Sequence, residues 1–134
     1  MERKEMIDFS HVYEKRVTVA DDVVELSSDF LLPEQFDDAK RVIRVEGTLR
    51  PGGRYISGRE AEYEGEMVYS VLYLTDSNCI KNAVFKTKYS KSITLPEGIE
   101  DSFSTFPVFS GVECKLVNPR KMHLRCNIKL NFSY

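Results

Sequence analysis

The sequence predicts an all-β protein, an antiparallel β-sandwich of about seven to nine strands. Long stretches alternate between apolar and polar residues, as the side chains of a strand do when only one face is buried. Clusters of Gly, Pro, Asn and Asp interrupt these stretches roughly every 8–12 residues, which is the spacing of turns in sandwiches and barrels. A helical pattern is weak everywhere, so strands must supply the core.

The final segment, residues 120–134, shows this alternation most clearly. One parity is apolar throughout and comprises Met122, Leu124, Cys126, Ile128, Leu130, Phe132 and Tyr134. The other parity is polar and basic, with Lys121, Arg125 and Lys129 at four-residue intervals. This pattern predicts a long strand with a buried apolar face and an outward basic face.

Earlier strands follow from the same pattern. Residues 66–76 are apolar on both parities, which predicts a central strand covered on both sides. Turns are expected at three sites, where Pro, Gly, Asn and Asp cluster: 51–53 (PGG), 75–78 (TDSN) and 118–120 (NPR). The glycines after Pro51 lack the Lys-Ser/Thr of a phosphate-binding loop, so a hairpin turn is the better interpretation.

The N-terminal third differs from the rest. Residues 5–19 alternate loosely, so residues 1–20 are expected to form an extended arm or edge strand. Asp21 and Asp22 are suitable caps for a helical turn, and Pro33 would interrupt it, so short helical pieces are expected near residues 21–38. Residues 21–134 form one domain, because 134 residues suffice for a single core.

The formal net charge is −2, so the chain as a whole lacks the charge of a nucleic-acid binder. The charge is unevenly distributed, however. Residues 1–38 carry 11 acidic and 4 basic residues, whereas residues 39–134 carry 10 acidic and 15 basic ones. Such asymmetry directs one part of a chain onto a neighbouring molecule or onto another part of itself.

Several features set the expected compartment and chemistry. The first residues lack the apolar segment of a secretory signal, and no stretch approaches the roughly 18 apolar residues of a membrane span. We therefore expect synthesis in the cytoplasm.

The sequence contains three separated cysteines, Cys79, Cys114 and Cys126, and only two histidines. This set does not suggest a zinc site or any other cofactor. They are buried thiols by default, with cross-linking as the alternative in an oxidising environment.

Motifs for catalysis are absent from the sequence, and no titratable cluster pairs a nucleophile with a base. We therefore expect no enzymatic activity. Four carboxylates share one parity of a predicted hairpin strand, at Glu60, Glu62, Glu64 and Glu66. They would suit a hard cation, but a solvated strand face is the favoured interpretation.

The basic face of the last strand allows three interpretations. Lys121, Arg125 and Lys129 could hold an anionic ligand such as a cell-wall glycan, although that face offers few aromatic side chains for stacking on bases or sugars. A solvated surface is the simplest alternative. The third is a docking surface for an acidic partner strand, and the N-terminal arm is the candidate, because extended segments add to exposed sheet edges.

Four stretches together resemble the SPOCS domain, which occurs in spore-envelope proteins of Clostridia and their relatives. The similarity covers roughly residues 30–132 and depends on the order and spacing of short motifs. The matching positions are Leu32-Pro33-Glu34, Val45 and Gly47, Gly65 through Leu72-Tyr73, Tyr89 through Pro96, and Asn118, Arg120 and Lys121. Two departures are the DDAK segment, where the family usually has Pro-Asp, and Tyr89, where Phe is common.

The resemblance implies a structural or recruiting role in the spore envelope, with no catalysis and no assigned ligand site. Larger relatives carry several SPOCS copies and often a peptidoglycan-binding LysM module, and this chain has one copy and no LysM. We therefore expect a subunit that associates with itself or with other coat proteins. In the expected contact, the arm adds as a strand to a neighbour, with Ile7, Phe9 and Tyr13 filling pockets.

Overall fold

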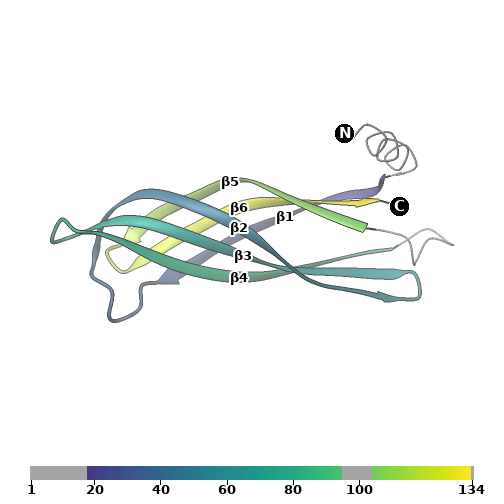
Figure 1. Cartoon of the computed structure of the whole chain (residues 1–134), viewed down its shortest axis with the longest axis horizontal. Coiled ribbons are helices and arrows are strands. Elements are labelled where there is room, and N and C mark those ends of the chain that lie inside the picture. The colour runs from purple at the N-terminus through teal and green to yellow at the C-terminus, as the bar shows by residue number, and fades with distance from the viewer. Residues whose placement is uncertain (1–17, 95–103, 134) are drawn as a thin grey trace, which may run out of the picture.

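A computed structural model describes residues 18–94 and 104–133 of the chain. Within these ranges, side chains are described from residue 23 onward, except those of residues 104, 106, 132 and 133. It contains six long strands: β1 (Thr18–Leu31), β2 (Ala39–Ser57), β3 (Glu60–Thr75), β4 (Ile80–Thr94), β5 (Ser104–Asn118) and β6 (Lys121–Ser133). They form two antiparallel three-stranded sheets, ordered β1-β6-β5 and β2-β3-β4. Figure 1 shows an elongated molecule whose strands run along its length.

The all-β, antiparallel prediction is thus confirmed, and the two packed sheets fit a sandwich. The described residues hold six strands, fewer than the seven to nine expected. The PGG segment does not end a strand, because β2 continues through it with an irregular register between Pro51 and Arg54. Gly52 is needed at this bulge, since a Cβ there would lie 2.6 Å from the carbonyl oxygen of Glu64. The chain reverses instead at Gly58, whose φ is +62°.

The expected helical pieces near residues 21–38 are not found, since the described residues contain no helix. Residues 18–31 instead form β1, which pairs with β6 along its whole length. The reason is packing: Val24, Leu26 and Phe30 point inward on one parity, and a strand buries that parity where a short capped helix would not. Residues 18–20 of the expected arm belong to β1, and residues 1–17 lie outside the described part.

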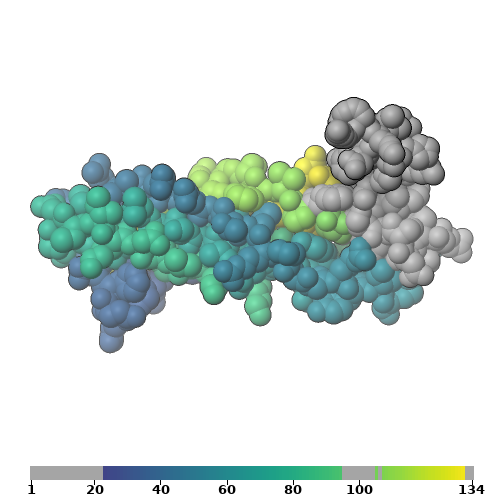
Figure 2. Space-filling view, viewed as in Figure 1, coloured from purple at the N-terminus to yellow at the C-terminus, as the bar shows by residue number. Residues whose placement is uncertain are grey.

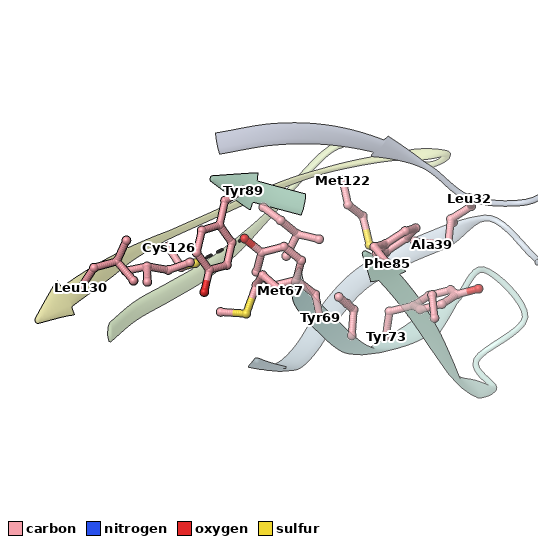
Figure 3. Packing of buried hydrophobic residues seen from close by; sticks show 14 of the residues in the cluster. Leu32, Ala39, Met67, Tyr69, Tyr73, Phe85, Tyr89, Met122, Cys126 and Leu130 are labelled. Atoms are coloured by element: carbon pink, nitrogen blue, oxygen red, sulfur yellow. Dashed lines mark hydrogen bonds between the residues drawn. The ribbon is translucent and has the colours of Figure 1, made fainter. Parts of the chain in front are cut away.

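The two central strands, β3 and β6, supply most of the core. On β6, all five inward side chains from Met122 to Leu130 have no exposed surface. They face the inward residues of β3, which include Met67, Tyr69, Val71 and Tyr73, each at most 1% exposed. Figure 3 shows this packing. The prediction that residues 66–76 are central is confirmed, but the described residues form only two layers, so their second face, including Val68 and Leu72, stays partly exposed.

Small residues and aromatic pairs join the sheets. A Cβ at Gly47 of β2 would lie 3.1 Å from the Phe109 ring and 3.3 Å from Val112, so glycine lets β2 approach β5 closely. On the opposite side, Phe30 of β1 stacks on Phe85 of β4 with ring centroids 5.1 Å apart. The result is a fixed stacking order in which β2 lies over β5, β3 over β6 and β4 over β1.

Three connections meet at one end of the sandwich, where the β1–β2 segment, the β3–β4 turn and the β5–β6 turn lie together (Figure 1). The turns predicted at 75–78 and 118–120 are both found here. The backbone amide of Asp76 donates to the carbonyl of Asp38, and that of Ala39 donates to the carbonyl of Pro119. Backbone bonds thus tie both turns to the β1–β2 segment. No helix in the described residues is long and apolar enough to cross a bilayer.

Candidate functional site

The outer face of the β1-β6-β5 sheet holds the basic residues that the sequence singled out. Lys121, Arg125 and Lys129 of β6 share this face, because the alternate residues of that strand are buried in the core. Register places Ser27 of β1 opposite Arg125, with Glu113 of β5 on the other side of it. The predicted basic face therefore exists, but it is shared with acidic neighbours.

Arg125 illustrates this sharing. Its guanidinium donates to the Glu113 carboxylate with an Nη2–Oε1 distance of 3.0 Å, and the two side chains are 47% and 63% exposed. Such exposed pairs contribute little to stability, typically about 0–1 kcal/mol. The pair does, however, reduce the positive charge that an anionic ligand would meet at the centre of this face.

A second contact between polar side chains involves His123, which lies two residues before Arg125 on β6. His123 Nδ1 is 2.7 Å from Asp29 Oδ1, and His123 Nε2 is 2.9 Å from Ser27 Oγ. The imidazole thus bridges two residues of β1 that flank it on the same face. With Glu25 also on the outer side of β1, the acidic first strand lies directly beside the basic last strand. Glu25 and Asp29 therefore balance part of the basic charge of β6 within the chain itself.

The order Ser27, His123, Asp29 is that of a serine-hydrolase triad, and sequence reasoning missed it because the residues lie 94 and 96 positions apart. The surroundings do not suit catalysis. In a working triad the carboxylate is buried and preorganised donors await an oxyanion. Here the Asp29 side chain is 51% exposed, and Ser27 lies exposed on an edge strand. We assign these bonds to holding β1 against β6.

A depression of about 470 Å³ accompanies these pairs on the same face. Both signs of charge line it, so it suits a polar or zwitterionic group better than a strong anion. Its lining residues are Glu25, Ser27, Glu113, Cys114, Lys115, His123 and Arg125.

The carboxylates predicted on one parity do lie on one outer face, that of β3 in the other sheet. Glu60 accepts a hydrogen bond of 2.7 Å from the Thr94 hydroxyl, and Glu66 lies 3.7 Å from Arg50. Within the described residues, no group of three or more His, Cys, Asp or Glu side chains is arranged to hold a metal ion. A row of carboxylates along an outward strand face is therefore what these residues form.

The three thiols lie in different environments. Cys79 is exposed in the β3–β4 turn, Cys114 is partly buried on β5, and Cys126 is fully buried on β6. Burial raises the pKa of Cys114 to about 11. Burial also raises the pKa of Cys126, whose Sγ lies 3.4 Å from the Tyr69 hydroxyl. Only Cys79 is therefore placed for cross-linking between folded molecules.

Arg120 is a key residue that sequence reasoning named only as part of the family motif. Its guanidinium donates to the carbonyl oxygens of Leu32 (3.2 Å), Pro33 (2.7 Å) and Phe36, and lies 3.1 Å from Asp38 Oδ1. Its backbone amide donates to the Asn118 side chain, which shapes the turn. Arg120 thus fastens the β1–β2 segment to the β5–β6 turn.

The Arg120 contact joins two of the sequence stretches that were singled out above. The Leu32-Pro33-Glu34 and Asn118-x-Arg120 stretches are far apart in the sequence but meet at one end of the sandwich. Gly65 and Tyr89 likewise pair across β3 and β4, and the Tyr89 ring lies over Gly65, whose Cβ position is 2.5 Å from the phenolic oxygen. Both contacts stabilise the fold and leave the outer faces open.

Comparison of the chain with protein-family models, with curated proteins and with solved structures gives no match. The arm residues Ile7, Phe9 and Tyr13 lie outside the described part of the chain, so their expected contacts remain predictions.

Proposed function

We propose that this protein is a non-enzymatic structural subunit that associates with copies of itself or with coat proteins of a bacterial spore envelope. The observation that carries the proposal is the state of its sheet edges. Within the described residues, β1, β2, β4 and β5 each pair with another strand on one side only. These edges are 14–19 residues long, and β4 also exposes Ile80 and Val84.

Long unpaired edges are sites where another chain can add a strand, and proteins usually shield them. Strand addition supplies backbone hydrogen bonds for affinity and side-chain pockets for specificity. The N-terminal residues precede β1 directly and are a suitable donor, with Ile7, Phe9 and Tyr13 on one parity. The spore location rests on the sequence resemblance to the SPOCS domain alone.

The test compares the full chain with a chain lacking residues 1–17, a cut that keeps β1 whole. We expect large assemblies from the full chain and a folded monomer from the shortened one, measured by light scattering and circular dichroism under reducing conditions. Phe9→Asp should weaken assembly, whereas Ser10→Asp, on the other parity, should not. A full chain that stays monomeric at high concentration, or a shortened chain that fails to fold, would contradict the proposal.

A binding module for an anionic glycan or peptidoglycan fragment is the second candidate. The depression beside Arg125, Lys115 and His123 favours it, and the paired carboxylates of Glu113 and Asp29 count against it. Replacing Lys121, Arg125 and Lys129 by alanine would abolish binding of a muramyl-peptide probe in calorimetry and leave the oligomeric state unchanged.

A further inference from the structure

The outward charged residues of the two central strands have opposite signs. On β3, the outer parity presents Glu60, Glu62, Glu64 and Glu66 in succession. On β6, the outer parity presents Lys121, Arg125 and Lys129, with His123 among them. The two rows overlap only in part along the molecule. β6 begins with Lys121 at the end where β3 finishes with Thr75, so the β3 carboxylates lie toward the other end, nearest Lys129.

The flanking strands reverse the pattern. In the β2-β3-β4 sheet, Lys86 and Lys88 of β4 lie on the outer face beside the acidic centre, and Arg50 lies there on β2. In the β1-β6-β5 sheet, Glu25 and Asp29 of β1 lie beside the basic centre. One face is thus acidic in the middle and basic at its sides, and the other face is largely the reverse. The exceptions are Glu46 on β2, which lies 3.6 Å from Arg44, and Lys115 on β5, which lies opposite His123 in the register.

We propose that the outer face of the β1-β6-β5 sheet of one copy packs on the outer face of the β2-β3-β4 sheet of the next copy. The stacking order inside the molecule indicates how. There, β6 lies over β3 and β1 over β4. Repeating this order between copies places Lys129 near Glu66, and Glu25 and Asp29 near the β4 lysines, while Lys121 and Arg125 face the half of β3 that ends at Thr75.

Such a contact joins two different surfaces, so it does not close as a twofold dimer and instead continues into a ring or filament. The faces are large enough. A three-stranded sheet with 16-residue strands is roughly 50 Å long and 14 Å wide, so stacking covers about 700 Å² on each partner. Stable interfaces bury about 800 Å² on each partner.

Apolar side chains add to the contact. The outer face of β3 carries the partly buried Val68, Leu72 and Leu74, and β4 adds Ile80 (61% exposed) and Val84 (53%). The opposite face carries exposed apolar side chains at its margins, on β1 and β5: Val23, Leu31, Val108 and Val117. Covering them removes apolar surface from water. Figure 2 shows that residues 39–94 occupy most of the visible side of the molecule, so this face is broad.

The ion pairs within each face do not oppose the contact. Arg125–Glu113 and Arg50–Glu66, at 3.0 and 3.7 Å, are exposed pairs that contribute little alone. Each carboxylate can accept from more than one donor, so a stacked neighbour adds partners without requiring these pairs to break. This inference rests on the proposed self-association, but it uses sheet faces where the proposed strand addition uses edges.

The test uses charge-reversed full-length chains, examined by light scattering and sedimentation. Lys86→Glu/Lys88→Glu reverses the basic side of the β2-β3-β4 face, and Glu25→Lys/Asp29→Lys reverses the acidic side of the β1-β6-β5 face. We expect each to weaken association by about 100-fold or more, because like charges then oppose each other. Mixing the two variants should restore association, because every contact is again between opposite charges. In wild type, 1 M salt should weaken association strongly, since screening then acts within about 3 Å.

Glu34→Lys/Asp76→Lys is the matched control. It makes the same change in net charge as Glu25→Lys/Asp29→Lys, at exposed residues of the β1–β2 segment and the β3–β4 turn, away from both faces. It should associate like the wild type. Association that survives both reversals, or that mixing fails to restore, would overturn the face-to-face contact. If it then disappears on removal of residues 1–17, strand addition alone stands. A wild-type chain that is monomeric at every salt and protein concentration would overturn both.

Discussion

The two faces of β6 perform different tasks, although their residues alternate along one strand. The inward residues Met122, Leu124, Cys126, Ile128 and Leu130 have no exposed surface, whereas Arg125 and Lys129 between them are exposed. Burial and close packing make inward positions costly to change, and outward ion pairs contribute little to stability. The comparison teaches that folding and association can be altered separately in this protein.

The largest loss of stability is expected when an inward residue of β6 is changed. Leu124→Ala should lower the free energy of unfolding by about 2–5 kcal/mol, because it removes buried methyl groups and leaves a cavity. Urea denaturation measures this loss. Asn127→Ala, one strand position from an inward residue but outward and exposed, is the control and should change stability by less than about 0.5 kcal/mol. Equal losses for the two variants would show that the faces are not distinct.

Arg120 is expected to be nearly as sensitive, although it lies in a turn. Arg120→Ala removes donors from three backbone carbonyls and from Asp38 at once. Since charged donors each contribute about 1.5–3 kcal/mol and the side chain is one-third exposed, we expect a loss of about 2–3 kcal/mol. Arg44→Ala, at an arginine whose side chain is 66% exposed, is the control. A loss below 0.5 kcal/mol for Arg120→Ala, as estimated for surface changes, would refute the proposed fastening role.

The thiol of Cys114 should make the stability of the protein depend on pH. Burial raises the pKa of Cys114 from 9.0 to about 11, so the folded protein holds its proton more tightly than the unfolded chain. Its contribution to stability is therefore full below pH 9 and is lost as pH rises through about 11. Cys114→Ala should flatten this part of the stability curve, as measured by urea denaturation at a series of pH values.

Thiol labelling tests the burial of the cysteines directly. In labelling of the native protein at pH 8, exposed Cys79 should react quickly, and Cys114 and Cys126 slowly. Three equally fast thiols would contradict the assigned burial.

Outward pairs should give small effects. His123→Ala removes contacts to Asp29 and Ser27, both on exposed β1 positions, and should cost less than about 1 kcal/mol. Arg125→Ala should behave similarly, and urea denaturation checks both. A loss above 2 kcal/mol for either variant would mean that the outer face contributes to folding as strongly as the core.

The smallest expected effect belongs to Tyr89→Phe. The Tyr89 hydroxyl is buried and finds no hydrogen-bond partner among the described residues. Removing an unpaired buried hydroxyl relieves its desolvation cost, so stability should stay the same or rise by about 1 kcal/mol. A clear loss of stability on thermal unfolding would show that the hydroxyl has a partner.

The sequence predicted secondary structure correctly where local alternation of residues decides it. The prediction was wrong where pairing with a distant strand decides it. Residues 120–134 alternate without exception, and β6 buries one parity as predicted. Residues 21–31 have a weaker pattern, and their acidic start suggested a helix cap. Pairing with β6 made them a strand, because Leu26 and Phe30 then reach the core. A partner 100 residues away cannot be read from the local pattern.

For the candidate site, the sequence by itself determined which residues share a strand face, since a period of two follows from strand geometry alone. It thereby determined the basic row of β6 and the acidic row of β3. Only the tertiary structure decided their neighbours: Glu113 beside Arg125, Asp29 beside His123, and Arg120 beside the β1–β2 segment. The physical reason is that charge and hydrogen bonding act between residues that are close in space, and strand register sets which residues those are.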